Sequence, residues 1–190
     1  MLGIVKHTAR YSDVRRQKSD GATYTPMVLA SFVAGQMLRV AKLPERGGIR
    51  MLDPAVGDGA LLSAFIKQLP SSIQQRLDVV GYDTDPDAIR IASQRLRHEF
   101  PDLRVQLEQK NFLEHVLNLQ GHGDLFSSSV VQEPFHLVIA NPPYVRTQIM
   151  GAKQAQRLAQ GFGLTGRVDM YYPFFGWISK EGLSMASVIG

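Results

Sequence analysis

The alternation of short apolar runs with segments of helical spacing is the feature that most constrains the fold of this chain. Apolar runs at 49–52, 77–82 and 135–140 each end at a polar or glycine-bearing turn. The stretches 60–69 and 86–99, which follow the first two runs, place apolar residues at helical spacing. Repeated units of strand, loop and helix predict an α/β fold with a mainly parallel sheet and helices on both faces.

The remaining segments extend this pattern towards both ends of the chain. A helix is expected over 26–43, because its apolar residues recur at helical spacing and Pro26 suits a first helical turn. We also expect a strand over 103–107, a helix over 169–180, a strand over 184–189, and loops over 120–134 and 145–166 in which the pattern fixes no helix. Residues 1–21 are interpreted as a flexible basic lead-in and residues 22–190 as one domain.

Composition excludes several classes of function. The 190 residues include no cysteine and five scattered histidines, so neither a disulfide framework nor a metal site is expected. The apolar runs are shorter than a bilayer span, and no signal-peptide core follows the first charges. We therefore expect a soluble cytoplasmic protein without a membrane partner. The net charge of +4 is compatible with a polyanionic partner but too small to identify one.

The turn after the first strand has the composition of a ligand-binding turn. In an open parallel sheet, ligands bind beyond the carboxyl ends of the strands, where strand order reverses. Asp53 ends the first strand there, and Gly57 and Gly59 allow the main chain to approach a ligand closely. A dinucleotide site is the obvious competitor, but its third glycine is replaced by Leu62. An ordinary turn would also explain these residues one by one.

The next two strand ends favour an adenosine-containing ligand. Asp83 ends the second strand, where a carboxylate can accept both hydroxyls of a ribose. Asn111 and Phe112 follow the third strand and could meet an adenine edge and cover its face. S-adenosylmethionine carries an adenosine, an amino-acid end and a positive sulfonium, so it suits an acidic site better than a pyrophosphate would. It is the cofactor that these residues predict.

The four residues Asn141, Pro142, Pro143 and Tyr144 follow the strand expected over 135–140. An exocyclic amino group is a poor nucleophile because its lone pair is delocalised into the ring. The amide oxygen of Asn141 and the carbonyl of Pro142 can accept its hydrogens, with the prolines fixing φ, and Tyr144 offers a flat stacking face. These residues are the candidate catalytic group. An ordinary Asn-Pro turn is the alternative interpretation.

Taken together, the chain resembles the gamma class of adenine-N6 DNA methyltransferases of restriction-modification systems. The resemblance is carried by the segments Tyr24-Thr25-Pro26, Asp53 to Ala60, Tyr82 to Pro86, Asn111-Phe112-Leu113, Asn141 to Arg146 and Gly166 to Tyr171, in the order of that class. It covers residues 22–189 and implies a Rossmann-like methyltransferase fold that uses S-adenosylmethionine. It also implies transfer of a methyl group to N6 of an adenine flipped out of double-stranded DNA.

The resemblance implies cofactor-binding roles for residues at each of the turns. It assigns the methionine end to Thr25, Asp53 and Ala55, close approach to Gly57, the ribose to Asp83, and the adenine to Thr84, Asn111 and Phe112. Asn111 stands where the family usually has Asp, so one acceptor oxygen is kept and a charge is lost. No metal is implied. Asn141 and Pro142 would accept the target amino hydrogens, with Pro143 holding the turn and Tyr144 stacking on the base.

The resemblance also implies parts that this chain does not contain. In the family a sixth and a seventh strand and a target-recognition domain follow, so we expect the last strands to be missing and a recognition domain or subunit to come from another chain. A protein-glutamine methyltransferase and an RNA amino methyltransferase are alternatives, because an amide or amino nitrogen poses the same chemical problem. A cofactor-binding but inactive fragment or subunit is a third.

Overall fold

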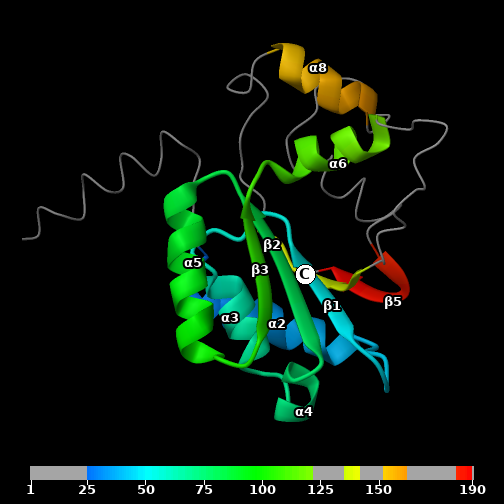
Figure 1. Ribbon diagram of the computed structural model, residues 1–190. Coiled ribbons are helices and arrows are strands. Elements are labelled where there is room, and N and C mark those ends of the chain that lie inside the picture. The colour runs from blue at the N-terminus through cyan, green and yellow to red at the C-terminus, as the bar shows by residue number, and fades with distance from the viewer. Residues whose placement is uncertain (1–24, 122–134, 142–151, 162–182, 190) are drawn as a thin grey trace, which may run out of the picture.

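A computed structural model of the chain describes residues 25–121, 135–141, 152–161 and 183–189 (Figure 1). Within them, five parallel strands form one sheet in the order β3-β2-β1-β4-β5. The strands are β1 (Ile49–Asp53), β2 (Leu77–Asp83), β3 (Arg104–Gln109), β4 (Phe135–Val138) and β5 (Leu183–Ile189). The chain moves outwards from β1 to β3 and then returns to the other side of β1, so strand order reverses between β1 and β4. This reversal is the point at which open α/β sheets bind ligands.

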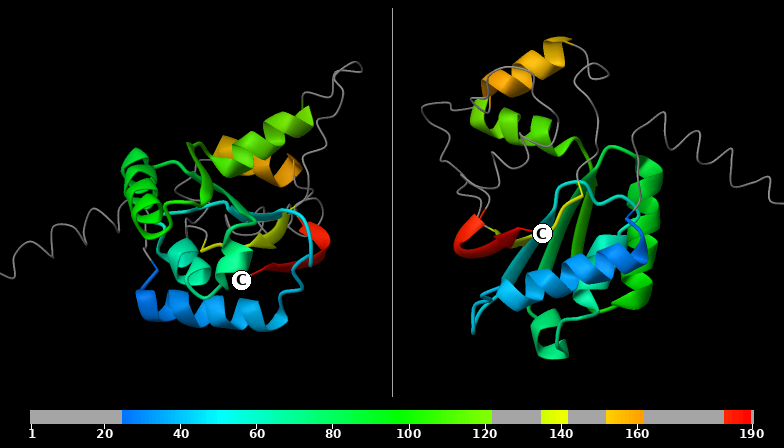
Figure 2. Two further views of the ribbon diagram at one scale, coloured as in Figure 1. Left: turned by 60° about the horizontal axis from the view of Figure 1, so that its bottom comes forward. Right: turned by 180° about the vertical axis from the view of Figure 1, so that it is seen from behind.

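Helices cover both faces of the sheet, as expected from the alternating sequence (Figure 2). They are α2 (Met27–Val40), α3 (Ala60–Ile66), α4 (Ser71–Gln74), α5 (Pro86–Glu99), α6 (Phe112–Gly121) and α8 (Ala152–Gly161). One apolar core joins α2, α3 and α5 to the face of the sheet that bears Met51 and Val79. A second core joins α6 and α8 to the opposite face, which bears Leu52 and Val80. Residues that alternate along β1 and β2 therefore enter different cores.

Helix α5 shows how the sequence sets a helix beside the site. Asp85 caps it by accepting a hydrogen bond from the Asp87 amide at 2.9 Å, and Pro86 occupies its first turn. Ala88, Ala92 and Leu96 recur every fourth residue and are buried against the sheet and α3. Small alanines let α5 lie close to its neighbours, which places it against the turn that follows β1.

The described elements confirm the expected strands and the helices over 26–43, 60–69 and 86–99 to within a few residues. Helix α6 was not expected, and α8 lies inside a segment interpreted as a loop. The apolar residues of α8, Ala152, Ala155, Leu158 and Ala159, do recur at helical spacing, so its sequence carries a helix signal that the loop interpretation overlooked. The helix expected over 169–180 lies outside the described residues.

Helix α2 differs from its sequence pattern in what it buries. The buried residues of α2 are Ala30, Ala34 and Met37, whereas Val28 and Phe32 are 85% and 62% exposed. Small residues thus form the contact with α3. Among the described helices, none is long and apolar enough to cross a membrane.

Candidate functional site

The turn between β1 and α3 has a backbone that favours glycine at two positions. Gly57 and Gly59 adopt φ values of +53° and +77°, in the left-handed region. A Cβ atom on Gly59 would lie 3.1 Å from the Cβ of Ala92 on α5, so a side chain there would press on that helix. The glycines therefore permit both the sharp turn and the close approach of α5.

The end of β2 holds this turn in place. The Gly57 amide donates a hydrogen bond to Oδ2 of Asp83 at 2.8 Å, and the Val56 amide donates to the carbonyl of Tyr82 at 2.8 Å. Oδ1 of Asp83 accepts from the amide of Asp85 at 3.0 Å. Asp83, predicted from the sequence to bind a ribose, thus also braces the glycine turn from the neighbouring strand.

Asp53 is a buried acid at the floor of the site. Its side chain is 1% exposed, and its Oδ1 accepts a hydrogen bond from the Ala55 amide at 3.1 Å. Burial raises the pKa of Asp53 from 3.8 to about 7, the Ala55 hydrogen bond opposes this rise, and the charge of Asp83 adds to it. A carboxylate with so little solvation gains strongly from a cationic partner.

Asn141 meets the start of α2 at the carboxyl end of β4. Its Nδ2 donates a hydrogen bond to Oγ1 of Thr25 at 3.0 Å across 116 positions of sequence. Beside it, the Ile139 amide donates to the carbonyl of Leu52, which ties this strand end to β1. The Thr25 contact fixes the orientation of the Asn141 amide, so the acceptor Oδ1 lies on the other side of the group.

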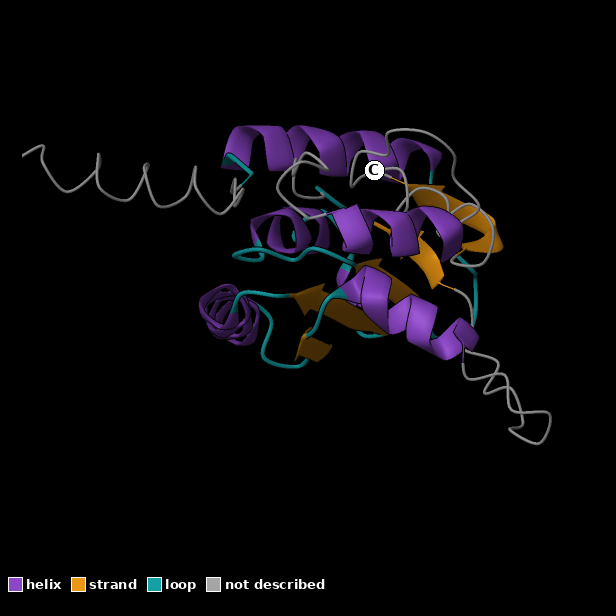
Figure 3. Ribbon diagram, turned by 90° about the horizontal axis from the view of Figure 1, so that it is seen from above, coloured by secondary structure: helices purple, strands orange, loops and turns teal. Residues whose placement is uncertain are grey.

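Thr25, Asp53, Gly57 and Asn141 border a depression at the carboxyl edge of the sheet, with about 280 Å³ of empty space that is open to solvent, and Asp83 lies outside its lining. Figure 3 looks onto this edge from above. The residues that line it are Thr25, Asp53, Ala55, Val56, Gly57, Asp58, Ala60, Leu61 and Asn141. The structure therefore brings together five residues that the sequence analysis selected from three separate motifs. Among the described residues, the lining includes acids but no lysine or arginine, which suits a cationic ligand.

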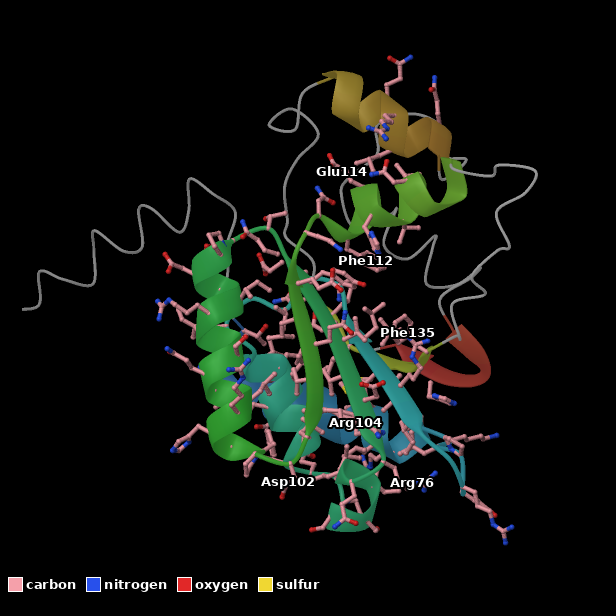
Figure 4. The ribbon with its side chains drawn as sticks, viewed as in Figure 1. Arg76, Asp102, Arg104, Phe112, Glu114 and Phe135 are labelled. Carbon is pink, nitrogen blue, oxygen red and sulfur yellow. The ribbon has the colours of Figure 1, made fainter. Side chains whose placement is uncertain are left out.

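The residues assigned to the adenine lie outside this lining. Oδ1 of Asn111 accepts a hydrogen bond from the Glu114 amide at 3.3 Å, so Asn111 caps α6. Phe112, the first residue of α6 and labelled in Figure 4, is buried and packs on Tyr82 with ring centroids 5.4 Å apart. Thr84 is exposed. The adenine-binding roles of these three residues stay predictions.

The catalytic tetrad is only partly described. Asn141 has a defined place in the site, whereas Pro142, Pro143 and Tyr144 lie outside the described residues. Asp58 lines the depression, but no role was assigned to it from the sequence. The position of Asp58 between Gly57 and Gly59, in a turn expected to bind a ligand, could have indicated from the sequence that it lines the site. Among the described residues, no group of three acids, histidines or cysteines could hold a metal ion.

Two curated relatives connect this site to known methyltransferases. The chain is 40% identical over 163 residues to the type II methyltransferase M.BanIII of Aneurinibacillus aneurinilyticus, covering 84% of this chain and 28% of the relative. It is 30% identical over 109 residues to the release factor glutamine methyltransferase of Escherichia coli, covering 57% of this chain and 32% of that protein. The chain thus spans about a third or less of the length of either relative.

Solved structures show the same fold at low sequence identity. The type IIG restriction endonuclease BpuSI superposes with a TM-score of 0.65 at 20% identity, over 93% of this chain and 20% of that chain. A Listeria monocytogenes protein described as a class I S-adenosylmethionine-dependent methyltransferase superposes with a TM-score of 0.53 at 17% identity, over 86% of this chain and 46% of that chain. The sheet and its helices form the Rossmann-like fold of S-adenosylmethionine-dependent methyltransferases.

A family model places the chain with the restriction-modification methyltransferases. It describes the Eco57I restriction-modification methylases and matches residues 78–181, a little over half of the chain. The match spans β2, β3 and β4 and includes the strand end that carries Asn141. This chain belongs to the Eco57I restriction-modification methylase family.

Proposed function

We propose that residues 22–190 form the catalytic domain of a DNA methyltransferase that transfers a methyl group from S-adenosylmethionine to N6 of adenine. One observation carries the proposal. The amide of Asn141 shares a depression with Asp53, Ala55 and Gly57 in a chain of the restriction-modification methylase family. The acceptor for an amino group and the acidic glycine turn are therefore neighbours, as methyl transfer between two bound molecules requires.

The residues of the depression suit the chemistry of this cofactor. When bound, S-adenosylmethionine supplies an electrophilic methyl group on a positively charged sulfonium. Asp53 would face the cationic amino-acid end together with Thr25 and Ala55, and Gly57 would allow close approach of the main chain. Asp83 would accept the ribose hydroxyls, because each of its oxygens has a second lone pair besides the one used by a backbone amide.

Asn141 has the chemistry to prepare the nucleophile. Since its Nδ2 is held by Thr25, Oδ1 can accept a hydrogen from the adenine amino group. This draws the nitrogen lone pair out of conjugation, and the pair then forms the new N–C bond as the C–S bond breaks. The methylated amino group loses a proton to solvent. Pro142 would provide the second acceptor, and Tyr144 would stack on an adenine flipped from the duplex.

Protein-glutamine methylation is the second candidate, favoured by the match to the release factor glutamine methyltransferase. A glutamine amide needs the same acceptors because its lone pair is also delocalised. The match to the type II methyltransferase is longer and closer, at 40% over 163 residues against 30% over 109. We therefore place DNA first. We also propose that groove contacts that select a sequence come from a recognition domain or subunit outside this chain.

Incubation with methyl-labelled S-adenosylmethionine and equal amounts of double-stranded DNA, structured RNA and a glutamine-bearing peptide tests the acceptor. Without a recognition domain or subunit we expect only weak label, which enters DNA at adenine and is absent from DNA that lacks adenine. Asn141→Ala is expected to reduce labelling on the order of 100-fold, the usual effect of removing one positioned transition-state hydrogen bond. Cofactor affinity should stay within about twofold, since Asn141 contributes to the acceptor side.

Asn118→Ala is the matched control. Asn118 is exposed on α6 and accepts a hydrogen bond from Arg157, away from the depression. It should label DNA as the original chain does. Label confined to the peptide would replace DNA by protein as the substrate. If the chain does not bind S-adenosylmethionine in calorimetry, the proposed cofactor site is wrong.

A further inference from the structure

We infer that Arg95 of α5 is a positioning residue for the glycine turn, acting through Asp58. This inference rests on the proposed function, because the turn is the surface offered to the cofactor. Neither residue was assigned a role from the sequence. They lie 37 positions apart, and the fold brings them together where α5 passes the start of α3.

Asp58 ties three parts of the site together. Its Oδ2 accepts a hydrogen bond from Nη2 of Arg95 at 3.0 Å, and its Oδ1 accepts from the Ala60 amide, the first residue of α3, at 3.1 Å. Asp58 also lines the depression. One carboxylate therefore links α5, the amino-terminal turn of α3 and the ligand-facing surface.

Next to the ion pair between Asp58 and Arg95, the following residue of the turn, Gly59, makes a close packing contact with α5. Gly59 lies against Ala92, which precedes Arg95 by one helical turn of α5. The Gly59 contact limits how closely α5 can approach, while the Asp58 ion pair holds it there. Together these two contacts fix the turn against a helix that is itself anchored to β2 and β3.

The surroundings of Arg95 make Asp58 its main anchor. Nη1 of Arg95 is buried without an acceptor among the described residues. The nearby carboxylate of Glu99 instead accepts hydrogen bonds from Ser63 and Lys67. The side chains of Arg95 and Asp58 are 27% and 21% exposed, so solvent screens the pair only in part.

Charge explains why the pair acts on the ligand site. Asp53, Asp58 and Asp83 all belong to or adjoin the same turn. Without Arg95, the Asp58 carboxylate would repel the other two acids and would lose the bond that fixes its direction. The turn would then leave the conformation in which Gly57 contacts Asp83. The affinity for S-adenosylmethionine should therefore fall, although Arg95 does not itself line the depression.

Calorimetric titration of the full chain with S-adenosylmethionine tests this inference. Arg95→Met keeps a long side chain but removes the charge, and Asp58→Asn keeps an acceptor for Ala60 but weakens the pair. Each variant is expected to weaken binding by roughly fivefold, the effect of losing an ion pair near the upper end of the range for partly screened pairs. Arg95→Lys should recover part of the affinity, because it restores the charge without the planar fork.

Lys67→Ala is the control, because it removes an ion pair with Glu99 that is remote from the depression. It should lower thermal stability without changing affinity, which separates positioning from general stabilisation. The double variant Asp58→Asn/Arg95→Met should bind about as weakly as either single variant, as expected for two partners in one interaction.

The outcomes separate the two proposals. If the original chain does not bind S-adenosylmethionine, the proposed function fails. If it binds and Arg95→Met binds within twofold of it, the role of Arg95 is refuted, whatever the effect of Asp58→Asn, because Asp58 itself lines the depression. Losses that multiply in the double variant would also refute a shared interaction. Circular dichroism checks that each variant is folded, and if Arg95→Met is not folded, Arg95→Lys, which leaves Asp58 in place, decides the question: affinity within twofold of the original chain in both Arg95→Lys and Asp58→Asn refutes the role.

Discussion

The buried carboxyl group of Asp53 makes a specific pH dependence of stability the most direct test of the site. Burial raises its pKa from 3.8 to about 7, against the opposing hydrogen bond from Ala55. In the folded state the group therefore holds its proton at pH values where the unfolded chain has released it. The free energy of unfolding consequently falls as pH rises from about 4 to about 7, and the penalty stays constant above that range.

The magnitude follows from the size of the shift. A rise from 3.8 to about 7 corresponds to a penalty of roughly 4 kcal/mol at high pH, at 1.36 kcal/mol per pKa unit. At pH 5 the folded chain already bears part of this penalty, because the unfolded carboxyl group is mostly ionised there. The contribution that develops between pH 5 and pH 8 is therefore roughly 2 to 3 kcal/mol.

Asp53→Asn isolates this contribution. The amide keeps an oxygen that can accept from the Ala55 amide, but it does not titrate. Urea unfolding of both proteins without ligand, at pH 5 and at pH 8, should show the variant gaining roughly 2 to 3 kcal/mol relative to the original chain between the two pH values. Groups that do not interact with Asp53 titrate alike in both proteins, so their contributions cancel. A difference between the two proteins that does not change from pH 5 to pH 8 would refute the raised pKa.

Three further changes test other parts of the structure by urea unfolding. Gly59→Ala should lose about 1 to 3 kcal/mol from its left-handed φ and from contact with Ala92, whereas Gly47→Ala, with a similar φ and nothing within 4 Å, should lose less. Asn111→Ala should cost about 1 kcal/mol by removing the cap of α6, and Asn111→Ser should restore most of it. Phe32→Ser should change stability by less than about 0.5 kcal/mol, because Phe32 is 62% exposed. A loss as large as that expected for a buried phenylalanine would contradict this placement of α2.

The described strands and three of the helices could be predicted from sequence because each rests on local information. The runs at 49–52 and 77–82 are apolar and end in acids, and the 86–99 helix has both a cap and a regular apolar face. Helix α6 was missed because Asn111 and Phe112 were interpreted as ligand contacts. The same residues also make an ordinary helix start. The cap from Asn111 and the packing of Phe112 on Tyr82 give them this structural role, and a contact with adenine stays a prediction.

For residues far apart in the chain, the sequence predicts that they lie at the same edge of the sheet but not which of them are in contact. Parallel strands place Asp53, Asp83 and Asn141 at one edge, which the sequence pattern anticipates. It does not give the pairing of Asn141 with Thr25 or that of Asp58 with Arg95, because each depends on how a helix lies on the sheet. The exposure of Val28 and Phe32 on α2 could not be predicted for the same reason, because helical spacing does not specify which apolar side chains pack against another element.

Asp83 shows how a ligand contact and a structural contact can coincide in one side chain. Both of its oxygens accept backbone amides, one from Gly57 in the turn after β1 and one from Asp85 at the start of α5. A ribose would use the remaining lone pairs of the same oxygens. Loss of the carboxylate would therefore remove a cofactor contact and release the turn at once, so a loss of binding could not be assigned to either effect. The ion pair between Arg95 and Asp58 joins the same turn to α5, and Arg95 itself does not line the depression. Comparing the two therefore separates the contribution of turn geometry from that of direct contact.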